Sequence, residues 1–569
     1  MTNKKTLTRA IKSGRGEIPS DLVLKNISML DVITGDISVT DIAISGDRIV
    51  GTHDEYSGRQ EIDCTGKWAV PGFIDTHLHI ESSLVTPLEF DRCVLPRGVT
   101  CVICDPHEIA NVLGAKGIEY FLSCALKTIM DIRINLSSCV PATVFETSGA
   151  QLELSDLLPF ASHEKVIGLA EMMNFPGVIN TDTAIIDKLV AFQDRHLDGH
   201  APLLSGKDLN AYLAAGIRTD HEATSEREAR EKLSKGMAIL IREGSVSKDL
   251  DALAPIINSD TASYLALCTD DRNPLDIAEE GHIDALIRRL IAKGIAPHLI
   301  YRMASLSAAR IFGLKDRGLL GPGWRADIVV LDDLEQCRIS SVICGGRVVN
   351  DELFAARETV MPVGLNSMKA KPVLPKSFEM KPLHGKNQMP VIRVKPGLII
   401  TFKDEAVLAV TEKGVRPDLK KDIIKVAVVE RHGINGNIGH GFVSGFGLKS
   451  GAIASSVGHD SHNITVIGVN DADMALAVNR LIELKGGFCV ADNGYILSEL
   501  ALPIAGLMSE EPFEEISLAL EHLRETAHSL GCTLPEPFLQ VAFLALPVIP
   551  HIKMTDKGLF DVDKFEFVT

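Results

Sequence analysis

Two histidines one residue apart, His77 and His79, end an apolar run that begins at Ala69. Successive side chains of a strand point to opposite faces, so both imidazoles are expected to project to the same side. Later apolar runs also end in side chains that can bind a metal, namely Glu171, His200, His221 and Asp270. Four imidazoles and two carboxylates suit Zn²⁺, Mn²⁺ or Fe²⁺. These residues predict a metal-dependent hydrolase.

The number of candidate ligands bears on the number of metals. Six ligands exceed what one tetrahedral ion needs, so we expect two divalent metal ions (iron, manganese or zinc) with Glu171 bridging them. Asp270 is followed directly by Asp271, and without a strand register the sequence leaves open which of the two faces the metals. Any one of these side chains could instead be a core or capping residue, but that explanation is weak for all six together.

Repeated strand and helix patterns must position the ligands. Strands are predicted over residues 73–79, 99–104, 132–139, 166–171, 198–201, 217–221, 237–242 and 264–269. Helical patterns between them include Asp182 to His196 and a helix after Ser225, which forms a capping-box pattern with Glu228. Eight such units in about 250 residues match a TIM (β/α)8 barrel, although alternation alone also permits a doubly wound sheet. Only the barrel brings all the ligand-bearing strand ends to one mouth, so we expect a barrel over 70–320.

The flanking segments predict further domains in this α/β chain. Short alternating runs at 1–69 and 321–360 predict one small discontinuous β domain, which begins with a loose polar N-terminal arm to about residue 17. Residues 361–390 are rich in Pro and Lys and are expected to be a linker. Residues 391–569 predict a separate C-terminal α+β domain, with a Gly-rich stretch at 433–447 and a helix that ends at Gly486 and Gly487.

Composition limits the partners of the 569-residue chain. Its formal charge of −17 argues against nucleic acid or an anionic membrane surface as the main binding partner. Eleven cysteines, an odd number, are typical of reduced thiols in a cytoplasmic protein. We found no signal-peptide pattern and no apolar segment of membrane-spanning length. We therefore expect a cytoplasmic enzyme that acts on a small molecule, binds neither nucleic acid nor membrane, and forms a homo-oligomer.

Several motifs resemble those of a known enzyme family. Pro71 to His79, with single histidines on strands five and six and an aspartate on strand eight, resembles the amidohydrolase superfamily. Glu171 stands where many members bridge their metals with a carboxylated lysine. Further stretches resemble the adenine deaminase branch, namely 77–83, 105–111, 171–174, 199–202, 220–222, 269–272, 439–448 and 459–463. The resemblance implies an amidohydrolase-type TIM barrel with a small flanking β domain and a separate C-terminal α+β domain.

The resemblance also implies a reaction, the hydrolysis of adenine to hypoxanthine and ammonia. A hydroxide that bridges the metals would attack C6 of the purine, and Asp270 is expected to shuttle a proton from the water to the departing ammonia. A general acid is also needed near the ring nitrogen N1. Glu81 and Glu108 are both candidates for this acid, and with His107 they are the expected substrate-binding residues.

Alternatives remain open at this point. A cyclic-amide hydrolase of the same superfamily would normally carry the absent lysine, and a non-catalytic metal-binding scaffold would not need Asp270. A zinc deaminase of the His-x-Glu and Cys-x-x-Cys type would use His79, Glu81, Cys101 and Cys104, but cysteines three apart on one strand point to opposite faces. The segment from His459 to Asn463 could be a minor metal site, although we favour a lid or interface role for it.

Overall fold

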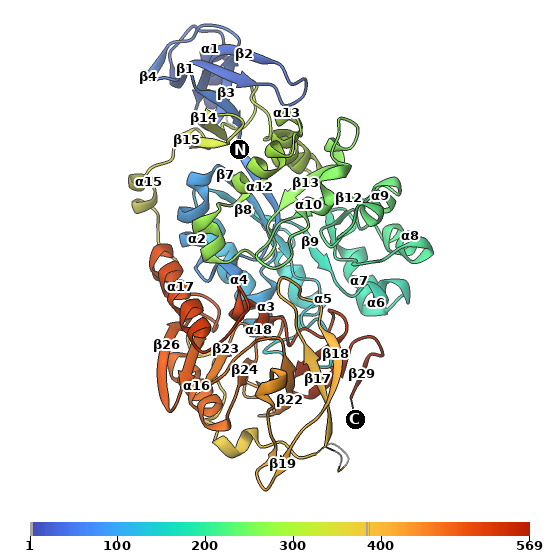
Figure 1. Cartoon of the computed structure of the whole chain (residues 1–569). Helices are drawn as coiled ribbons and strands as arrows, with labels where there is room; N and C mark the ends of the chain where they lie inside the picture. The colour runs from blue at the N-terminus through green and yellow to red at the C-terminus, as the bar shows by residue number, and fades with distance from the viewer. Residues whose placement is uncertain (1–3, 383–384, 386, 569) are drawn as a thin grey trace.

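The computed structural model describes residues 4–382, 385 and 387–568. A small β sheet lies at one end of the molecule, a barrel in the middle and a second α+β unit at the other end (Figure 1). Residues 1–3 of the predicted arm, residues 383, 384 and 386 of the predicted linker, and residue 569 lie outside the described residues. Among the described residues, no helix combines the length and apolar character needed to cross a bilayer.

Parallel strands occur in each of the eight regions predicted for the barrel. They are β6 (Phe73–Leu78), β7 (Val99–Cys104), β8 (Asp131–Leu136), β9 (Val166–Met172), β10 (His196–Gly199), β11 (Thr219–Asp220), β12 (Ala238–Arg242) and β13 (Leu265–Cys268). The first five form one sheet and the last three another. Backbone hydrogen bonds join the sheets at both seams, from Arg218 N to Leu197 O at 3.2 Å and from Asp270 N to His77 O at 2.9 Å. The strands thus close into a ring, which confirms the predicted barrel.

The barrel strands are rich in apolar residues because both of their faces are covered. Every residue of β6 and of β7 is buried. A parallel strand between a barrel interior and a helical layer has no solvent face, so its sequence does not alternate. Cys101 packs in a cluster shared by β6, β7, β12 and β13, whereas Cys104 belongs to a different hydrophobic cluster. The two thiols therefore do not converge on one ion, which removes the zinc-cysteine alternative.

Helices alternate with these strands. They are α2 (Pro87–Val94), α3 (His107–Leu113), α4 (Ala115–Ala125), α5 (Leu154–Leu157), α6 (Phe175–Ile179), α7 (Thr183–Ala191), α8 (Gly206–Ala214), α9 (Glu226–Ser234), α10 (Leu250–Leu253), α11 (Pro274–Glu279), α12 (Ile283–Ala292), α13 (Pro297–Arg302) and α14 (Ala308–Ile311). The prediction over 182–196 was wrong at its end, because α7 stops at Ala191 and His196 already begins β10. Ser225 caps α9 by accepting from Glu228 N, but the Glu228 carboxylate accepts from Thr224 N instead of completing the box.

Segments from both sides of the barrel share the small sheet. Its order is β16 (Arg347–Val348), β15 (Arg338–Cys344), β14 (Ile328–Asp333), β5 (Trp68–Pro71), β1 (Ser20–Leu30), β2 (Ile37–Ser45) and β3 (Arg48–Thr52), with β4 (Gly58–Asp63) also on β1. A short helix, α15 (Asp351–Ala355), follows it. The expected loose arm was wrong, because residues 4–14 form helix α1 (Lys4–Gly14). Ala10 packs against Val23, Ala43 and Val50, and this contact holds the helix on the sheet.

The C-terminal unit is built on an eight-stranded sheet. The strand order is β18 (Phe402–Val407), β17 (Gln388–Arg393), β22 (Ile438–Ser444), β21 (Ile423–Val429), β24 (Ile464–Gly468), β23 (Ala452–Ser455), β25 (Gly487–Asp492) and β26 (Tyr495–Ala501). Smaller elements complete it, namely α16 (Asp471–Leu484), α17 (Phe513–Ser529), α18 (Pro537–Ala542), the hairpin β19 (Val410–Thr411) and β20 (Gly414–Val415), and the sheet of β27 (Ile552–Thr555), β28 (Gly558–Asp561) and β29 (Glu566–Phe567). Helix α16 ends before Gly486, as predicted.

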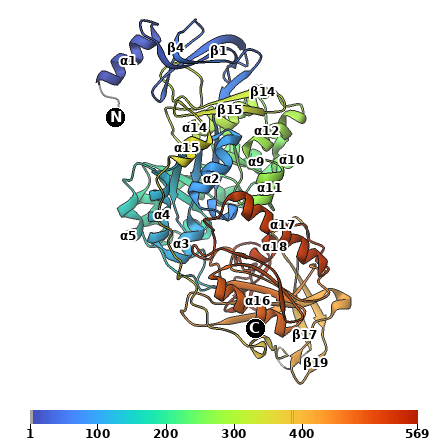
Figure 2. The ribbon, with the colours of Figure 1, turned by 90° about the vertical axis from the view of Figure 1, so that its left-hand side faces the viewer.

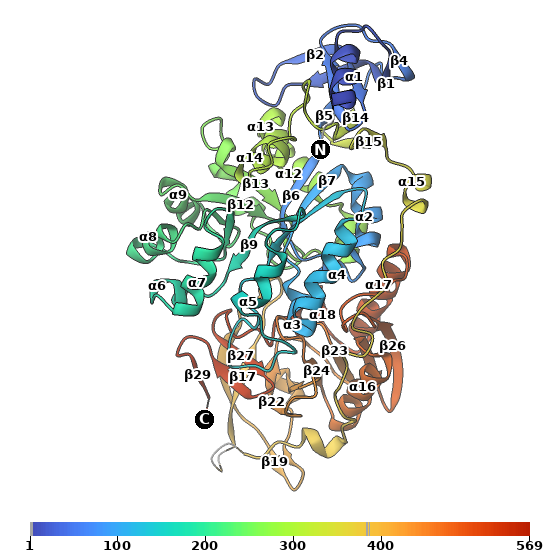
Figure 3. The same ribbon diagram turned by 180° about the vertical axis from the view of Figure 1, so that it is seen from behind.

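The C-terminal unit packs directly against the barrel. Figures 2 and 3 show it below the barrel, with α17 running beside α2 and the small sheet at the far end. Backbone and side-chain contacts cross the boundary, including Ser509 N to Leu84 O at 2.9 Å and Phe513 N to Glu89 Oε1 at 2.7 Å. Part of the predicted linker is not free chain, because Phe378 is fully buried in a cluster with α16.

A buried lysine holds two neighbouring strand ends of the barrel together. Lys232 of α9 is fully buried and donates to Ala201 O, Asp220 Oδ2 and Glu228 Oε1, each at 2.8 Å. Asp220 Oδ1 in turn accepts from Ala201 N at 2.9 Å. This network fixes the backbone beside His200 and His221, so one ammonium group sets the spacing of two predicted ligands.

We expect Lys232→Met to lower the free energy of unfolding by about 3–5 kcal/mol, because it leaves the buried Asp220 carboxylate and the partly buried Glu228 carboxylate without their cation. Urea denaturation of the two proteins measures this difference. Lys235→Met is the matched control, because Lys235 lies at the end of the same helix, is partly exposed and pairs with Glu231. Surface pairs contribute about 0–1 kcal/mol, so equal losses in the two variants would contradict this account.

Candidate active site

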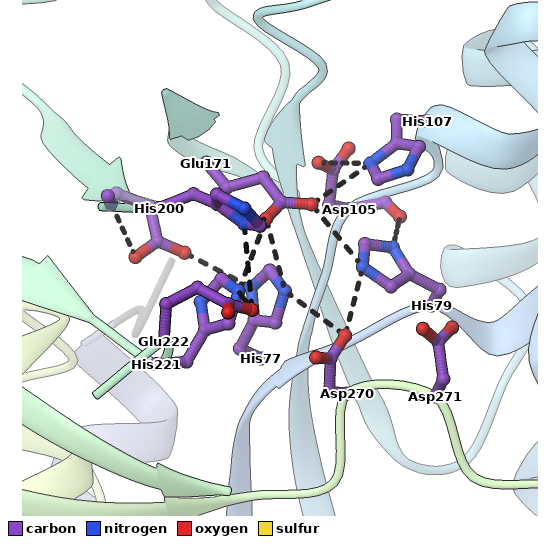
Figure 4. A network of polar contacts seen from close by, with 12 residues as sticks. His77, His79, Asp105, His107, Glu171, His200, His221, Glu222, Asp270 and Asp271 are labelled. Carbon is purple, nitrogen blue, oxygen red and sulfur yellow. Dashed lines mark hydrogen bonds and ion pairs between the residues drawn. The ribbon is translucent and has the colours of Figure 1, made fainter. Parts of the chain in front are cut away.

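The structure brings the six predicted metal ligands together at the carboxyl ends of the barrel strands (Figure 4). His77 lies in β6 and His79 directly follows it, and Glu171 lies in β9. His200, His221 and Asp270 follow β10, β11 and β13. Five of the six are less than a tenth exposed, and His200 is intermediate. Residues almost two hundred positions apart thus meet because parallel barrel strands end at one mouth.

Glu171 is the centre of the cluster. Its Oε1 lies 3.4 Å from His79 Nε2 and 3.2 Å from His107 Nδ1. Its Oε2 lies 2.7 Å from His200 Nδ1 and 3.2 Å from His221 Nε2. Burial disfavours the charged form, but the hydrogen bonds from these imidazoles hold the pKa of Glu171 well below its usual range. Each carboxylate oxygen thus faces a different group of imidazoles.

Hydrogen bonds fix which ring nitrogens face the centre. His79 Nδ1 donates to the carbonyl of Asp105 at 2.9 Å, and His77 Nδ1 lies 3.3 Å from Asp198 Oδ2. A bond from one ring N–H to an oxygen leaves the other nitrogen free to bind a metal. Both Nε2 atoms point toward Glu171 and Asp270, at separations of 3.3 to 4.0 Å.

Asp270, and not Asp271, faces the imidazoles. Asp270 Oδ1 lies 3.3 Å from His79 Nε2 and 3.8 Å from His77 Nε2, whereas Asp271 accepts from Ser82 outside the cluster. The backbone of Asp270 is left-handed, with a φ of 54°, a conformation that side chains other than glycine rarely adopt. Arg242 donates to Asp270 Oδ2 at 2.9 Å. Burial opposes the charge on Asp270, but His79 and Arg242 hold its pKa well below the usual range.

The donor set fits divalent metal ions. Groups with ligand atoms within 4.8 Å of one another include His77, His79 and Asp270; His77, Glu171 and His221; His200, His221 and Glu222; and His79, Asp105, His107 and Glu171. Among the described residues, His77 Nε2 and His221 Nδ1 are buried without a hydrogen-bond partner. Buried polar atoms without partners are costly, and His77 Nε2 faces carboxylates rather than apolar surface. The cluster therefore has the composition of a site for one or more divalent metals.

Sequence reasoning missed several supporting residues. Asp198 holds His77, and Asp105 accepts from His107 Nδ1 at 3.1 Å. Glu222 pairs with Arg242 and lies 3.5 Å from His221 Nε2. Asp198 precedes His200 by two positions at the end of β10, so strand alternation could have placed both side chains on one face. Arg242 gave no such signal, because a charged residue at a strand end is commonly exposed.

The predicted substrate-binding residues lie at one side of the mouth. Glu81 is buried, its Oε1 accepts from Ile109 N at 3.0 Å, and its Oε2 has no partner among the described residues. Burial and the charge of Glu108 raise the pKa of Glu81 to about 7. The pKa of Glu108 is shifted in the opposite direction. Burial favours its neutral form, but His459, His462 and His107 hold its pKa well below the usual range.

A loop of the C-terminal unit reaches into the mouth. His459 Nδ1 lies 2.7 Å from Glu108 Oε1, and His462 pairs with Glu108 Oε2. Asp460 Oδ1 lies 3.7 Å from His107 Nε2. These loop side chains are buried, not exposed on a surface turn. The predicted lid or interface segment thus contacts the residues next to the metal cluster.

A cavity opens beside the cluster. It has a volume of about 540 Å³ and lies between barrel loops and the C-terminal unit. Glu222 and Arg242 line its inner side, and Leu398, Ile400 and Ile549 contribute apolar walls. A pocket with apolar walls and a few polar groups at one end is typical of a small-molecule site.

Comparison with known proteins places the chain in a family. The amidohydrolase family profile matches residues 68–349, and the adenine deaminase C-terminal domain profile matches residues 398–566. Adenine deaminase 1 of Rhizobium meliloti is 62% identical over 562 residues, covering 99% of this chain and 99% of that protein. Adenine deaminase of Brucella anthropi is 63% identical over 562 residues, covering 99% of this chain and 100% of that protein. The chain therefore belongs to the adenine deaminase family of the amidohydrolases.

Proposed function

We propose that the protein hydrolyses adenine to hypoxanthine and ammonia, using two divalent metals held by the cluster around Glu171. Full-length relatives named adenine deaminase support the substrate. The observation that carries the two-metal proposal is the Glu171 carboxylate, whose oxygens face separate sets of imidazoles. A carboxylate in this arrangement would bridge two cations when they are bound, in the way that the carboxylated lysine of other amidohydrolases does.

The ligands divide into two groups around that carboxylate. His77, His79 and Asp270 would hold one metal, and His200 and His221 the other. When bound, such metals lower the pKa of coordinated water from 15.7 toward about 7, which supplies the nucleophile at neutral pH. Asp198 and the carbonyl of Asp105 keep His77 and His79 turned toward the centre. The predicted choice among iron, manganese and zinc, the homo-oligomeric state and the cytoplasmic location stay predictions.

Asp270 is placed to move protons. Its Oδ1 faces the cluster while Arg242 holds Oδ2, so the carboxylate stays ionised and oriented. We assign it the removal of a proton from the attacking water and the delivery of that proton to the departing ammonia. Water thereby adds to C6, the C–N bond breaks, and ammonia leaves. The second proton of the water is released as the C6 carbonyl forms, and it restores the group that protonated N1.

Glu81 is the better of the two candidates for protonating N1. Both oxygens of Glu108 already face imidazoles, at His459 and His462, whereas Glu81 keeps one buried oxygen without a partner. A general acid must be able to reach the substrate with a free oxygen. Glu108 then serves to hold the loop of the C-terminal unit in the mouth.

The metal-loaded protein is expected to release ammonia from adenine. Dihydropyrimidines and hydantoins are the controls, because a cyclic-amide hydrolase would open these rings instead. Ammonia is measured by a coupled assay, and ring opening by loss of substrate absorbance. Faster turnover of either cyclic amide than of adenine would contradict the proposal and favour the alternative.

His77→Ala and Asp270→Asn separate metal binding from proton transfer. We expect His77→Ala to lose metal, because it removes an imidazole between Glu171 and Asp270. Asp270→Asn keeps an oxygen ligand but not a base, so it should retain metal while kcat for adenine falls about 10²–10⁴-fold. Metal analysis of both proteins, beside the ammonia assay, tests this. Full turnover by Asp270→Asn would remove Asp270 from the shuttle role.

Glutamine at position 81 or 108 tests the choice of general acid. Glu81→Gln keeps the shape but cannot donate an acidic proton, so kcat should fall about 10²–10⁴-fold with the metals around Glu171 retained. Glu108→Gln is the matched variant and should lower kcat by a smaller factor. A larger loss in Glu108→Gln would reverse the assignment, and unchanged turnover in both would exclude both residues.

A further inference from the structure

A second cluster of metal-ligating side chains lies at the boundary between the barrel and the C-terminal unit. His107 and Glu108 begin α3, just after β7. Asp460 comes from the loop between β23 and β24, more than three hundred residues later in the chain. Ligand atoms of these three residues all lie within 4.8 Å of one another, and each residue is less than a tenth exposed.

The separations within this cluster are those of ligands around a shared ion. His107 Nε2 lies 3.2 Å from Glu108 Oε1 and 3.7 Å from Asp460 Oδ1. Ligand atoms placed about 2.0–2.2 Å from a cation are roughly 3–3.5 Å apart. His459 Nδ1 lies 2.7 Å from Glu108 Oε1, a hydrogen-bonding distance, so His459 pairs with the proposed ligand Glu108 and is not counted among the ligands.

Unpartnered polar atoms point to a ligand between these side chains. Among the described residues, His107 Nε2 and Asp460 Oδ2 are buried and lack a hydrogen-bond partner, and Glu108 Oε1 faces His107 Nε2 and His459 Nδ1. One such atom is costly, and two in one cluster need a common explanation. One imidazole and two carboxylates, buried together with their ligand atoms within 4.8 Å of one another, are a donor set that suits a divalent cation.

The tautomer of His107 agrees with this explanation. Its Nδ1 lies 3.1 Å from Asp105 Oδ2, and Asp105 Oδ1 accepts from Ser137 Oγ at 2.7 Å. An imidazole that binds a metal through one nitrogen commonly donates its other N–H to a carboxylate. Asp105 thus stabilises the proton on Nδ1 and leaves Nε2 free toward Glu108 and Asp460.

We propose that His107, Glu108 and Asp460 bind a third divalent transition-metal cation at this boundary, separate from the two metals assigned to the Glu171 cluster. One imidazole and two carboxylates suit zinc, manganese or ferrous ions. The barrel supplies two ligands and the C-terminal unit supplies the third, so the cation links the two units. Its role is to hold the loop from Gly458 to Asn463 in the mouth of the barrel.

Metal counting on the full-length protein tests the proposal. The protein is loaded with Mn²⁺ or Zn²⁺ and dialysed, and the bound metal is measured by mass spectrometry. We expect three equivalents in the unmodified protein and two in Asp460→Asn, which keeps the volume of the side chain but loses its charge. Two equivalents in the unmodified protein, or equal counts in both proteins, would overturn the proposal and leave protonated imidazoles as the partners of Glu108.

Asp556→Asn is the matched control. Asp556 is buried at the same boundary and accepts from Thr147 N at 2.8 Å and Thr147 Oγ1 at 2.7 Å, but it belongs to the C-terminal unit away from His107. This variant loosens the boundary without removing a proposed ligand, so its metal count should equal that of the unmodified protein. A loss of one equivalent here as well would assign the effect to the boundary and contradict the ligand role of Asp460.

Anomalous scattering gives a test that needs no variant. Crystals of the loaded protein, measured at the absorption edge of the metal, should show a peak between His107, Glu108 and Asp460 in addition to the peaks beside Glu171. Absence of that peak would overturn the proposal even if Asp460→Asn does not fold. Adenine turnover is measured on the same samples, so failure of the third site remains distinct from failure of the proposed reaction.

Discussion

One buried carboxylate, that of Glu171, is the feature on which the rest of the site depends. A lone carboxylate in a protein interior costs several kcal/mol unless it is paired, and Glu171 is only 2% exposed. Five imidazoles lie around it, and each comes from a different position in the barrel. The barrel strands must therefore end where their imidazoles can reach the Glu171 carboxylate. The positions of the strand ends thus decide whether this buried charge is paired.

Outer hydrogen bonds keep this arrangement in place. Asp198 and Asp105 fix imidazole orientations, Arg242 fixes Asp270, and Lys232 fixes the backbone beside two further histidines. Most of these partners are charged and buried, so each charge offsets the desolvation cost of the oppositely charged group that it contacts. Such a network is rigid only when it is complete, because a missing partner leaves an unpaired charge. The site is thus preorganised by charge pairing more than by apolar packing.

The sequence predicted the fold and the gathering of the six candidate ligands at one mouth because both follow local rules. Apolar runs of strand length marked all eight barrel strands, and the residues at their ends were the side chains that meet at the mouth. Contacts that join remote segments gave no local signal, so Arg242 and the pairing of Glu108 with His459 were missed. The N-terminal helix was missed because its contacts with the sheet, at Ala10 and at the polar residue Ser13, do not form an apolar stripe that the sequence would show.

The insertion of the His459 to His462 loop has a consequence for how the protein is made. During synthesis the N-terminal domains of a chain fold first, so the barrel can form before this loop leaves the ribosome. Until then Glu108 lies without two of its imidazole partners, in a mouth still open to solvent. The finished pocket is therefore a late product of folding, and an isolated barrel would carry a catalytic centre with one wall missing.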